Sequence, residues 1–120
     1  MELTEDLKFA AGDPVMLFRA SDNPNVSELN GHKGAYVTDG PFLFDEGGKL
    51  RMVWSSMYHG RYLVLEAWSD TLLGKWEHGG SRFDFDGGHA MIFDTLDGKR
   101  MISLHRPNTV NDERAFFYEY

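Results

Sequence analysis

The chain has 120 residues, of which 42% are hydrophobic, so it can form one domain with an apolar core but not two. The formal net charge is −7 without a basic patch, which argues against nucleic acid as a partner, and the lack of cysteines excludes disulfides and thiolate metal sites. Neither a signal peptide nor a membrane-spanning stretch is found, so no membrane partner is expected. The cellular compartment is therefore not determined, because a signal peptide could have been lost with an upstream segment.

Short apolar runs alternate with turn-forming residues along the chain, a pattern typical of strands, and no helix of ordinary length is predicted. In chain order, we predict strands over residues 15–19, 41–45, 50–56, 62–69, 75–79, 90–95, 99–105 and 114–120. Glycine-rich and proline-containing turns at residues 46–48, 59–60, 79–80, 97–98 and 106–108 separate them.

The sequence contains an internal repeat. The segment DGPFLFD begins at Asp39 and aligns with GHAMIFD, which begins at Gly88, 49 residues later; GKLRMVW at 48–54 aligns with DGKRMIS at 97–103. A period near 50 residues with several strands in each unit is typical of a β-propeller blade. The repeat places His89 opposite Gly40 and next to Asp39, so we expect Asp39 and His89 at the same axial end.

We therefore predict an all-β fold, a partial β-propeller of about two to two and a half blades, each a four-stranded antiparallel sheet. The single domain 1–120 divides into the end of a preceding blade with its connection (15–38), a complete blade (39–79) and a last blade (88–120). A small β-sandwich is the alternative, since it needs a similar number of strands. The aligned repeat favours blades.

Several motifs, in order, resemble glycoside hydrolase family 43, a family of five-bladed propellers that act on arabinose- and xylose-containing polysaccharides. The motifs are MLFRASD at 16–22, VTDGPFLF at 37–44, KLRMVWSS at 49–56, EAWSDTLLGKWEHGG at 66–80, DGGHAMIFDTLDGKRMISLHRPN at 86–108 and ERAFFYEY at 113–120. The resemblance covers nearly the whole chain and maps onto the C-terminal half of the family's catalytic domain.

The resemblance implies an inverting glycosidase, in which one carboxyl group protonates the leaving oxygen while another activates a water. Asp39 stands where the family carries its general acid, usually a glutamate in an EGP-like pattern, so the shorter aspartate is a departure. The family's base and its third carboxylate, which adjusts the pKa of the acid, are expected in blades preceding Met1. The resemblance also implies that His89 holds a metal, commonly calcium, directly or through a water.

Each candidate has a structural alternative. Asp39, before Gly-Pro, suits a turn, because its side chain can accept backbone N–H bonds. Trp54 and His105 are predicted to contact the substrate at strand ends, although an exposed loop is the simpler account of His105. Trp68 and Trp76 are expected to pack between blades, and Glu66 to pair with an arginine.

The predicted partner is an arabinose- or xylose-containing carbohydrate. A half propeller leaves apolar blade edges unpaired, so we expect either a homo-oligomer or an N-terminal half elsewhere. The alternative to a glycosidase is a non-catalytic carbohydrate-binding or structural fragment, which needs only the aromatic residues and the rim of the pocket.

Overall fold

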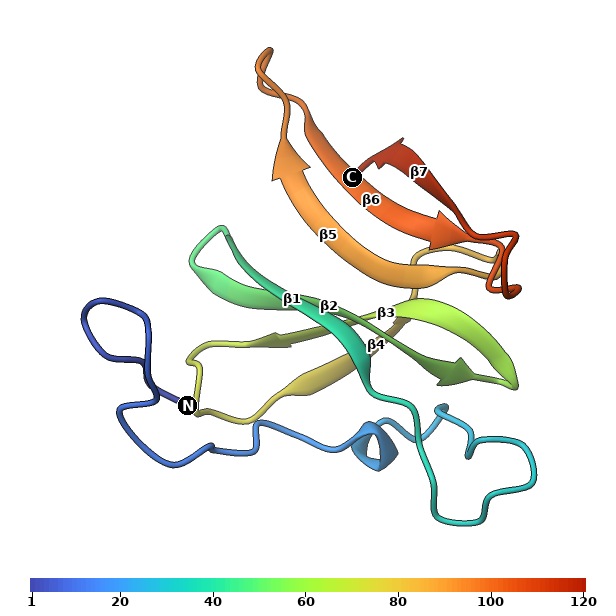
Figure 1. Ribbon diagram of the computed structural model, residues 1–120, viewed down its shortest axis with the longest axis horizontal. Helices are drawn as coiled ribbons and strands as arrows, with labels where there is room; N and C mark the ends of the chain where they lie inside the picture. Colours follow the sequence, from blue (N-terminus) through green and yellow to red (C-terminus); the bar gives the residue numbers. More distant parts are fainter.

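A computed structural model describes all residues from Met1 to Tyr120. The chain is all-β, as predicted, with two antiparallel sheets and one short 3-10 turn at Ala20–Asp22 (Figure 1). The first sheet has the order β1 (Asp39–Glu46), β2 (Lys49–Tyr58), β3 (Arg61–Ser69) and β4 (Glu77–Ser81); the second has β5 (Gly88–Asp94), β6 (Arg100–Arg106) and β7 (Arg114–Glu119). The chain contains no helix long and apolar enough to cross a membrane.

Strands form over seven of the eight predicted ranges, and only β4 is displaced, starting at Glu77. The prediction of a strand over residues 15–19 is wrong. This segment has no backbone ladder, Val15 and Met16 are exposed, and only Leu17 and Phe18 pack on the first sheet. The apolar run therefore reflects packing of an irregular segment rather than strand pairing.

The sequence repeat corresponds to two similar hairpins, β1–β2 and β5–β6. In both, the register shifts within the first few residues of the inner strand, between Asp39 and Phe42 in β1 and between Gly88 and Met91 in β5. Gly40 and His89 occupy matching positions in these irregular stretches, and both have positive φ angles, of 50° and 56°. The two hairpins therefore share a local bend at the same end.

Two apolar clusters lie on opposite faces of the first sheet. Trp54, Leu63, Leu65 and Trp76 belong to the cluster under the N-terminal segment, with Phe18 against it. The second cluster fills the space between the sheets, where β5 packs against β1, β2 and β3, and consists of Val53, Val64, Ala90, Ile92, Ile102 and Leu104. Since β2 and β3 are covered on both faces, each contains a run of consecutive apolar residues, 52–54 in β2 and 62–65 in β3.

The C-terminal residue links the two sheets. The Tyr120 hydroxyl donates to Glu66 Oε1 at 3.3 Å, and the same carboxylate lies 3.3 Å from Arg82 Nε, which confirms the expected arginine partner of Glu66. The Arg82 guanidinium lies over the Tyr120 ring at 4.0 Å. Burial, followed by the negative charge of Glu66, raises the pKa of Tyr120 to about 12, so its hydroxyl stays a donor.

Candidate functional site

Asp39 lies at the start of β1 within a small polar network. The Tyr62 hydroxyl, from the start of β3, donates to Asp39 Oδ2 at 2.6 Å. His89 Nδ1, from β5, lies 3.3 Å from Asp39 Oδ1. The structure therefore brings together the two residues that the repeat placed side by side, and adds Tyr62 as their neighbour.

The backbone around His89 places its ring beside Asp39. His89 has a φ of 56°, in the left-handed region, and its N–H donates to Ser55 Oγ at 2.9 Å. Gly40 passes so close that a Cβ there would lie 2.8 Å from the His89 Cα. Only a residue without a side chain fits at this crossing of β1 and β5.

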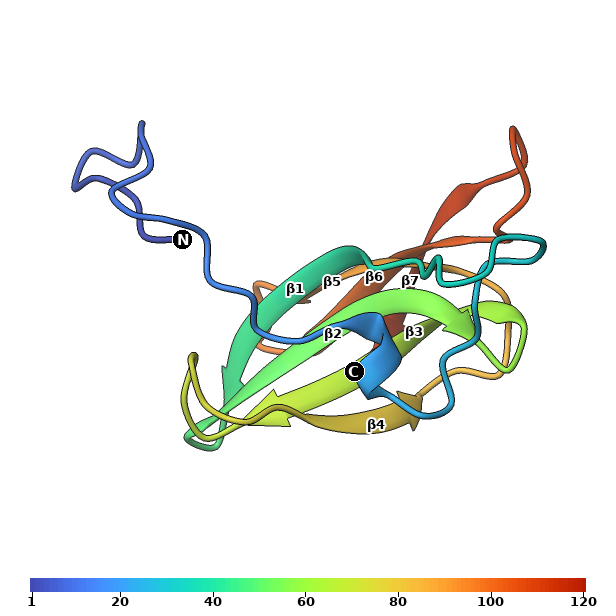
Figure 2. The ribbon, with the colours of Figure 1, turned by 90° about the horizontal axis from the view of Figure 1, so that it is seen from below.

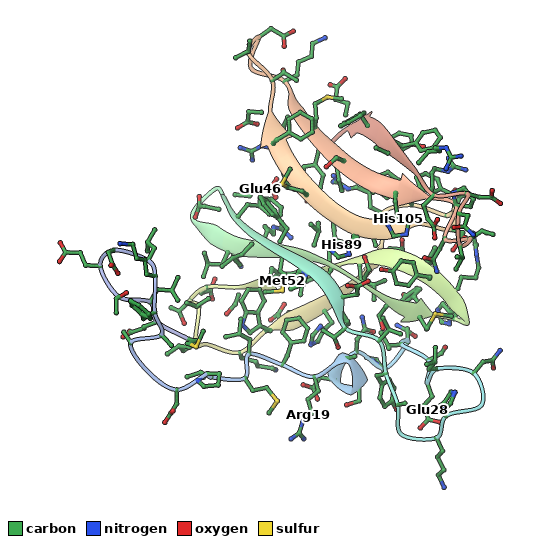
Figure 3. All side chains as sticks on the ribbon, viewed as in Figure 1. Arg19, Glu28, Glu46, Met52, His89 and His105 are labelled. Atoms are coloured by element: carbon green, nitrogen blue, oxygen red, sulfur yellow. The ribbon has the colours of Figure 1, made fainter.

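His105, at the end of β6, lies at the same end of the sheets as His89 (Figure 3). Its ring stacks on Tyr62 with centroids 5.8 Å apart and an interplanar angle of 18°, while Nε2 lies 3.1 Å from Asn108 Oδ1. A groove of about 280 Å³ runs beside it, lined by His89, Ser103, Leu104, His105, Glu113, Arg114 and Ala115. His105 is thus a strand residue that faces the groove.

The pKa of Asp39 lies below its ordinary value of 3.8, mainly because Tyr62 donates a hydrogen bond to the carboxylate. Burial raises this pKa by less than the hydrogen bond lowers it, and the charge of His89 lowers it further. Burial and the bond to Asp39 raise the pKa of Tyr62 far above its ordinary value. Asp39 is therefore an ionised acceptor and Tyr62 a permanent donor at neutral pH.

Trp54 does not lie at this site. Its side chain is 0% exposed and packs edge-to-face with Phe18 at 5.3 Å inside the first cluster, so no face of its ring is open to a sugar. Trp76, also buried, packs in the same cluster, against the N-terminal segment. We therefore correct the assignment of Trp54 from substrate contact to core.

A metal site is not formed by the side chains of this chain alone, because no group of three His, Asp or Glu side chains converges. Asp39 and His89 offer at most three ligand atoms, two carboxylate oxygens and one imidazole nitrogen, whereas a hard cation such as calcium takes six to eight oxygen ligands. A calcium site at His89 stays a prediction, and no chemical step is assigned to it.

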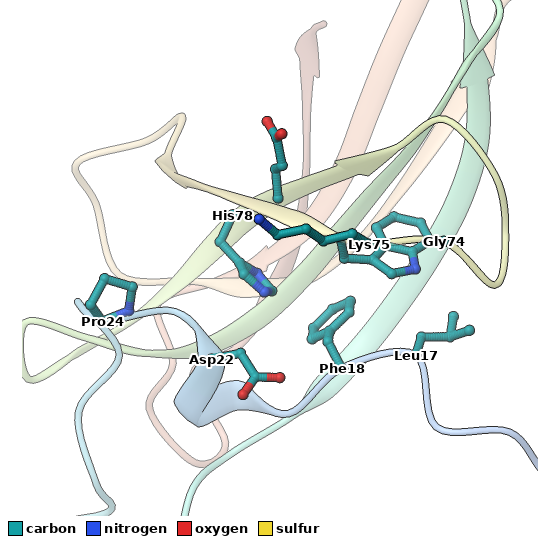
Figure 4. Close-up of a pocket in the computed structure, with 9 residues that line it drawn as sticks. Leu17, Phe18, Asp22, Pro24, Gly74, Lys75 and His78 are labelled. Atoms are coloured by element: carbon teal, nitrogen blue, oxygen red, sulfur yellow. The ribbon is translucent and has the colours of Figure 1, made fainter.

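The largest groove of the molecule, about 540 Å³, lies elsewhere (Figure 4). It runs between the N-terminal segment, with Phe18 and Asp22, and β4, with His78. None of the predicted site residues lines it, and its charged groups have both signs, so its size alone does not make it the functional site.

Two residues of the network, Ser55 and Tyr62, were not predicted from the sequence. Ser55 is fully buried and Tyr62 is 7% exposed, so both have the sequence context of core positions in long apolar strands. Gly88 is the one residue in the sequence that could have indicated these neighbours. A Cβ at this position would lie 2.3 Å from the Tyr62 ring and 2.7 Å from Ser55 Oγ, so only glycine fits. Paired glycines before a histidine can thus indicate a close approach.

Neither a known protein-family profile nor a curated protein sequence matches the chain. Three solved structures are similar. An endo-arabinase from Bacteroides thetaiotaomicron is 39% identical over 98% of this chain, with a TM-score of 0.89. A thermostable family-43 glycoside hydrolase is 21% identical over 98% of the chain, with a TM-score of 0.75. An endo-1,4-beta-xylanase from Bacteroides thetaiotaomicron is 21% identical over 69% of the chain, with a TM-score of 0.58.

The chain spans 44%, 41% and 33% of these three structures, respectively, so it corresponds to part of each propeller. The two structures at 21% identity support the fold alone. The endo-arabinase adds a sequence relationship over nearly the whole chain. The resemblance to glycoside hydrolase family 43 is confirmed, and the chain has the fold of part of such a propeller.

Proposed function

We propose that this chain carries the general acid side of a glycosidase site that acts on arabinose- or xylose-containing polysaccharides. The observation that supports this most is the network at the end of the sheets, where Tyr62 and His89 hold Asp39 at the start of β1, next to a groove. The 39% identity to an endo-arabinase adds weight to a carbohydrate substrate.

In the proposed inverting reaction, Asp39 gives a proton to the glycosidic oxygen as the bond to the leaving sugar breaks, while a second carboxylate activates a water on the other face. No residue of this chain is assigned as that base. The lowered pKa of Asp39 opposes the acid role, since a general acid must hold its proton near the working pH. A neighbouring carboxylate would be required to raise this pKa.

The same lowered pKa favours a second candidate, a non-catalytic carbohydrate-binding module. An ionised Asp39, oriented by Tyr62, is a strong acceptor for sugar hydroxyl groups without any proton transfer. The two candidates therefore share the site and the ligand, and differ in whether bond cleavage occurs.

The test is hydrolysis of aryl arabinoside, aryl xyloside and arabinan by the wild type, by Asp39→Asn and by the control Asp70→Asn. Asp70 is exposed and pairs only with Lys49 at the far end of the sheet. A working acid predicts a loss of about 10²–10⁴-fold in rate for Asp39→Asn and none for the control. Binding of oligosaccharides without hydrolysis by the wild type would favour the binding module, and neither activity nor binding would contradict both.

We also propose that the chain self-associates. Phe117 on β7 is 61% exposed and Phe116 is 40% exposed, and β7 is the unpaired edge of the second sheet. Exposed apolar edge strands are templates for pairing with another chain. Light scattering on a sizing column should give a dimer or larger species, whereas a monodisperse monomer would contradict this proposal.

A further inference from the structure

Among the edge strands of the two sheets, β7 is both regular and uncovered. The edge strand β4 has only five residues, two of them glycines, and the Asn23 side chain donates to its Gly79 carbonyl. The edge strands β1 and β5 are irregular near their starts and pack against each other. β7 has six residues without glycine or proline, and no strand lies beyond it (Figure 1). An edge that is neither short, bulged nor covered is a site for pairing with another strand.

The backbone groups that β7 leaves free follow from its ladder with β6. The Tyr120 N–H donates to the Arg100 carbonyl at 2.9 Å, so residue 120 faces β6. In an antiparallel strand, the N–H and C=O groups of one residue point to the same side, and successive residues alternate. The even-numbered residues of β7 therefore bond to β6, and Ala115, Phe117 and Glu119 direct their N–H and C=O groups toward the free edge.

The two phenylalanines of β7 lie on opposite faces of the second sheet. Phe116 is paired with Leu104, on the face that packs against the first sheet, and Phe117 is paired with Ser103, on the outer face. Both rings are exposed. A strand added at this edge would cover both rings, since side chains on directly opposite residues of a sheet contact each other.

A second copy of β7 fits this edge because the strand is complementary to itself. Two copies related by a two-fold axis perpendicular to the sheet pair antiparallel and keep the same faces together, so odd residues meet odd residues. With Phe117 opposite itself, Ala115 meets Glu119 of the second copy, and all three free residues pair within the strands. The neighbouring register puts Phe116 opposite itself and sets Glu119 against Glu113 of the second copy, a like-charge contact that is unfavourable.

We propose that this chain forms a two-fold symmetric dimer in which the β7 strands of two copies pair antiparallel, with Phe117 opposite Phe117. The three-stranded sheet of each copy then continues into that of the other. The register also places Arg114 opposite Tyr120 of the second copy, a favourable arrangement of a guanidinium and an aromatic ring. Because pairing uses both free edges, association stops at the dimer. The inference rests on the proposed self-association and does not depend on glycosidase activity.

The chain contains no cysteine, so single introduced cysteines report the register directly. In Phe117→Cys, the two new thiols lie on directly opposite residues with Cα atoms about 5.5 Å apart, within reach of a disulfide. In Phe116→Cys, the thiols lie on diagonal neighbours about 7–8 Å apart, beyond that reach. Leu96→Cys, in the exposed turn between β5 and β6, is the control for random collision. After mild oxidation, non-reducing gel electrophoresis should show Phe117→Cys mainly as a linked dimer and the other two mainly as monomers.

Ala115 gives a second test that leaves both phenylalanines in place. Ala115→Glu sets a carboxylate opposite Glu119 of the second copy, and the symmetric interface contains this contact twice. We expect the dimer dissociation constant to rise about fivefold in sedimentation equilibrium. Ala115→Lys introduces the opposite charge at the same place and should lower the dissociation constant.

Three results would overturn the proposal in different ways. Preferential cross-linking of Phe116→Cys would show that the register is wrong. A wild-type dimer in which Phe117→Cys and Phe116→Cys cross-link no more than Leu96→Cys, and which neither Ala115 variant changes, would show that the copies associate elsewhere. A wild type that stays monomeric would remove both the self-association and the paired edge, while hydrolysis at Asp39 is decided by its own assay.

Discussion

His89 has a left-handed backbone conformation although it carries a Cβ, with a φ of 56°. Such a conformation costs about 1–3 kcal/mol in a non-glycine residue and persists only where the surroundings hold it. Here the Ser55 hydroxyl accepts the His89 N–H, and Gly40 leaves room for the residue from the facing strand. The strain is thus located at the residue whose ring meets Asp39, which supports a functional rather than a purely structural role.

Gly88 offers the sharpest steric test of this network. A Cβ at Gly88 would lie 2.3 Å from the Tyr62 ring, so Gly88→Ala must displace Tyr62 or β5. We expect a loss of about 1–3 kcal/mol in the free energy of unfolding, measured by urea denaturation. Gly12→Ala is the control, because no atom lies within 4 Å of the added Cβ, and it should change stability by less than about 0.5 kcal/mol. Equal stability of the two variants would contradict the close approach.

For the individual residues of the site, the sequence predicted that Asp39 and His89 meet, but not which contacts hold them in place. The repeat placed Asp39 beside His89 because matching positions of adjacent blades lie at the same end. Tyr62 escaped prediction because an aromatic residue at the start of an apolar strand is usually core. The assignment of Trp54 to the substrate was wrong because β2 is covered on both faces. The residue pattern of a single strand does not show which elements cover it.

Among the elements, the irregular N-terminal segment is held on the first sheet by few contacts. Phe18 packs against Trp54, Trp76 and His78, with the His78 ring 4.8 Å away. The buried Asn23 side chain donates to the Gly79 carbonyl at 3.1 Å. These contacts and an isolated β-bridge between Val26 and Tyr58, rather than a strand ladder, fix the segment, and its first residues extend away from the sheets (Figure 2).

His78 makes the packing of this segment sensitive to pH. Its Nδ1 is buried without a partner, so a protonated ring would carry an unsatisfied donor, and burial lowers the pKa of His78 below 6.5 while Asp22 partly offsets this. Because the folded-state pKa is below the unfolded value, stability from this group is complete above pH 6.5 and is lost as the pH falls from 6.5 through the folded-state pKa.

Thermal unfolding between pH 8 and pH 5 should therefore show a decrease in stability on the acid side in the wild type. His78→Gln, which cannot be protonated, should show a smaller decrease, and His32→Gln, in an exposed loop, should keep the wild-type profile. Identical pH profiles for the wild type and His78→Gln would show that His78 does not control this packing.

Strands that are joined by tight turns could be predicted from the sequence. The conformation of residues 15–19, which are held by side-chain packing, could not. The β1–β2 hairpin closes on Gly47 and Gly48, whose positive φ angles of 62° and 81° suit the tight turn that the Gly-Gly pair predicts. Residues 15–19 have a strand-like composition, but whether a strand forms depends on a free partner edge, which composition does not encode.

At the scale of the whole molecule, two packed sheets form an open rather than a closed architecture. Only 20 of 120 residues are buried. The radius of gyration is 15.4 Å, compared with about 13.6 Å for a compact domain of this length. The chain matches 44% of the related endo-arabinase, and the apolar residues Phe116 and Phe117 on β7 are exposed.

Carbohydrate is expected to bind at the end of the sheets around Asp39. The most direct test is a titration of the protein with arabinotriose, followed residue by residue through amide chemical shifts. We predict shifts around Asp39, Tyr62, His89 and His105, extending to Arg114, with no change in the larger groove at Phe18 and His78. Shifts confined to that larger groove, or no shifts at saturating ligand, would contradict it.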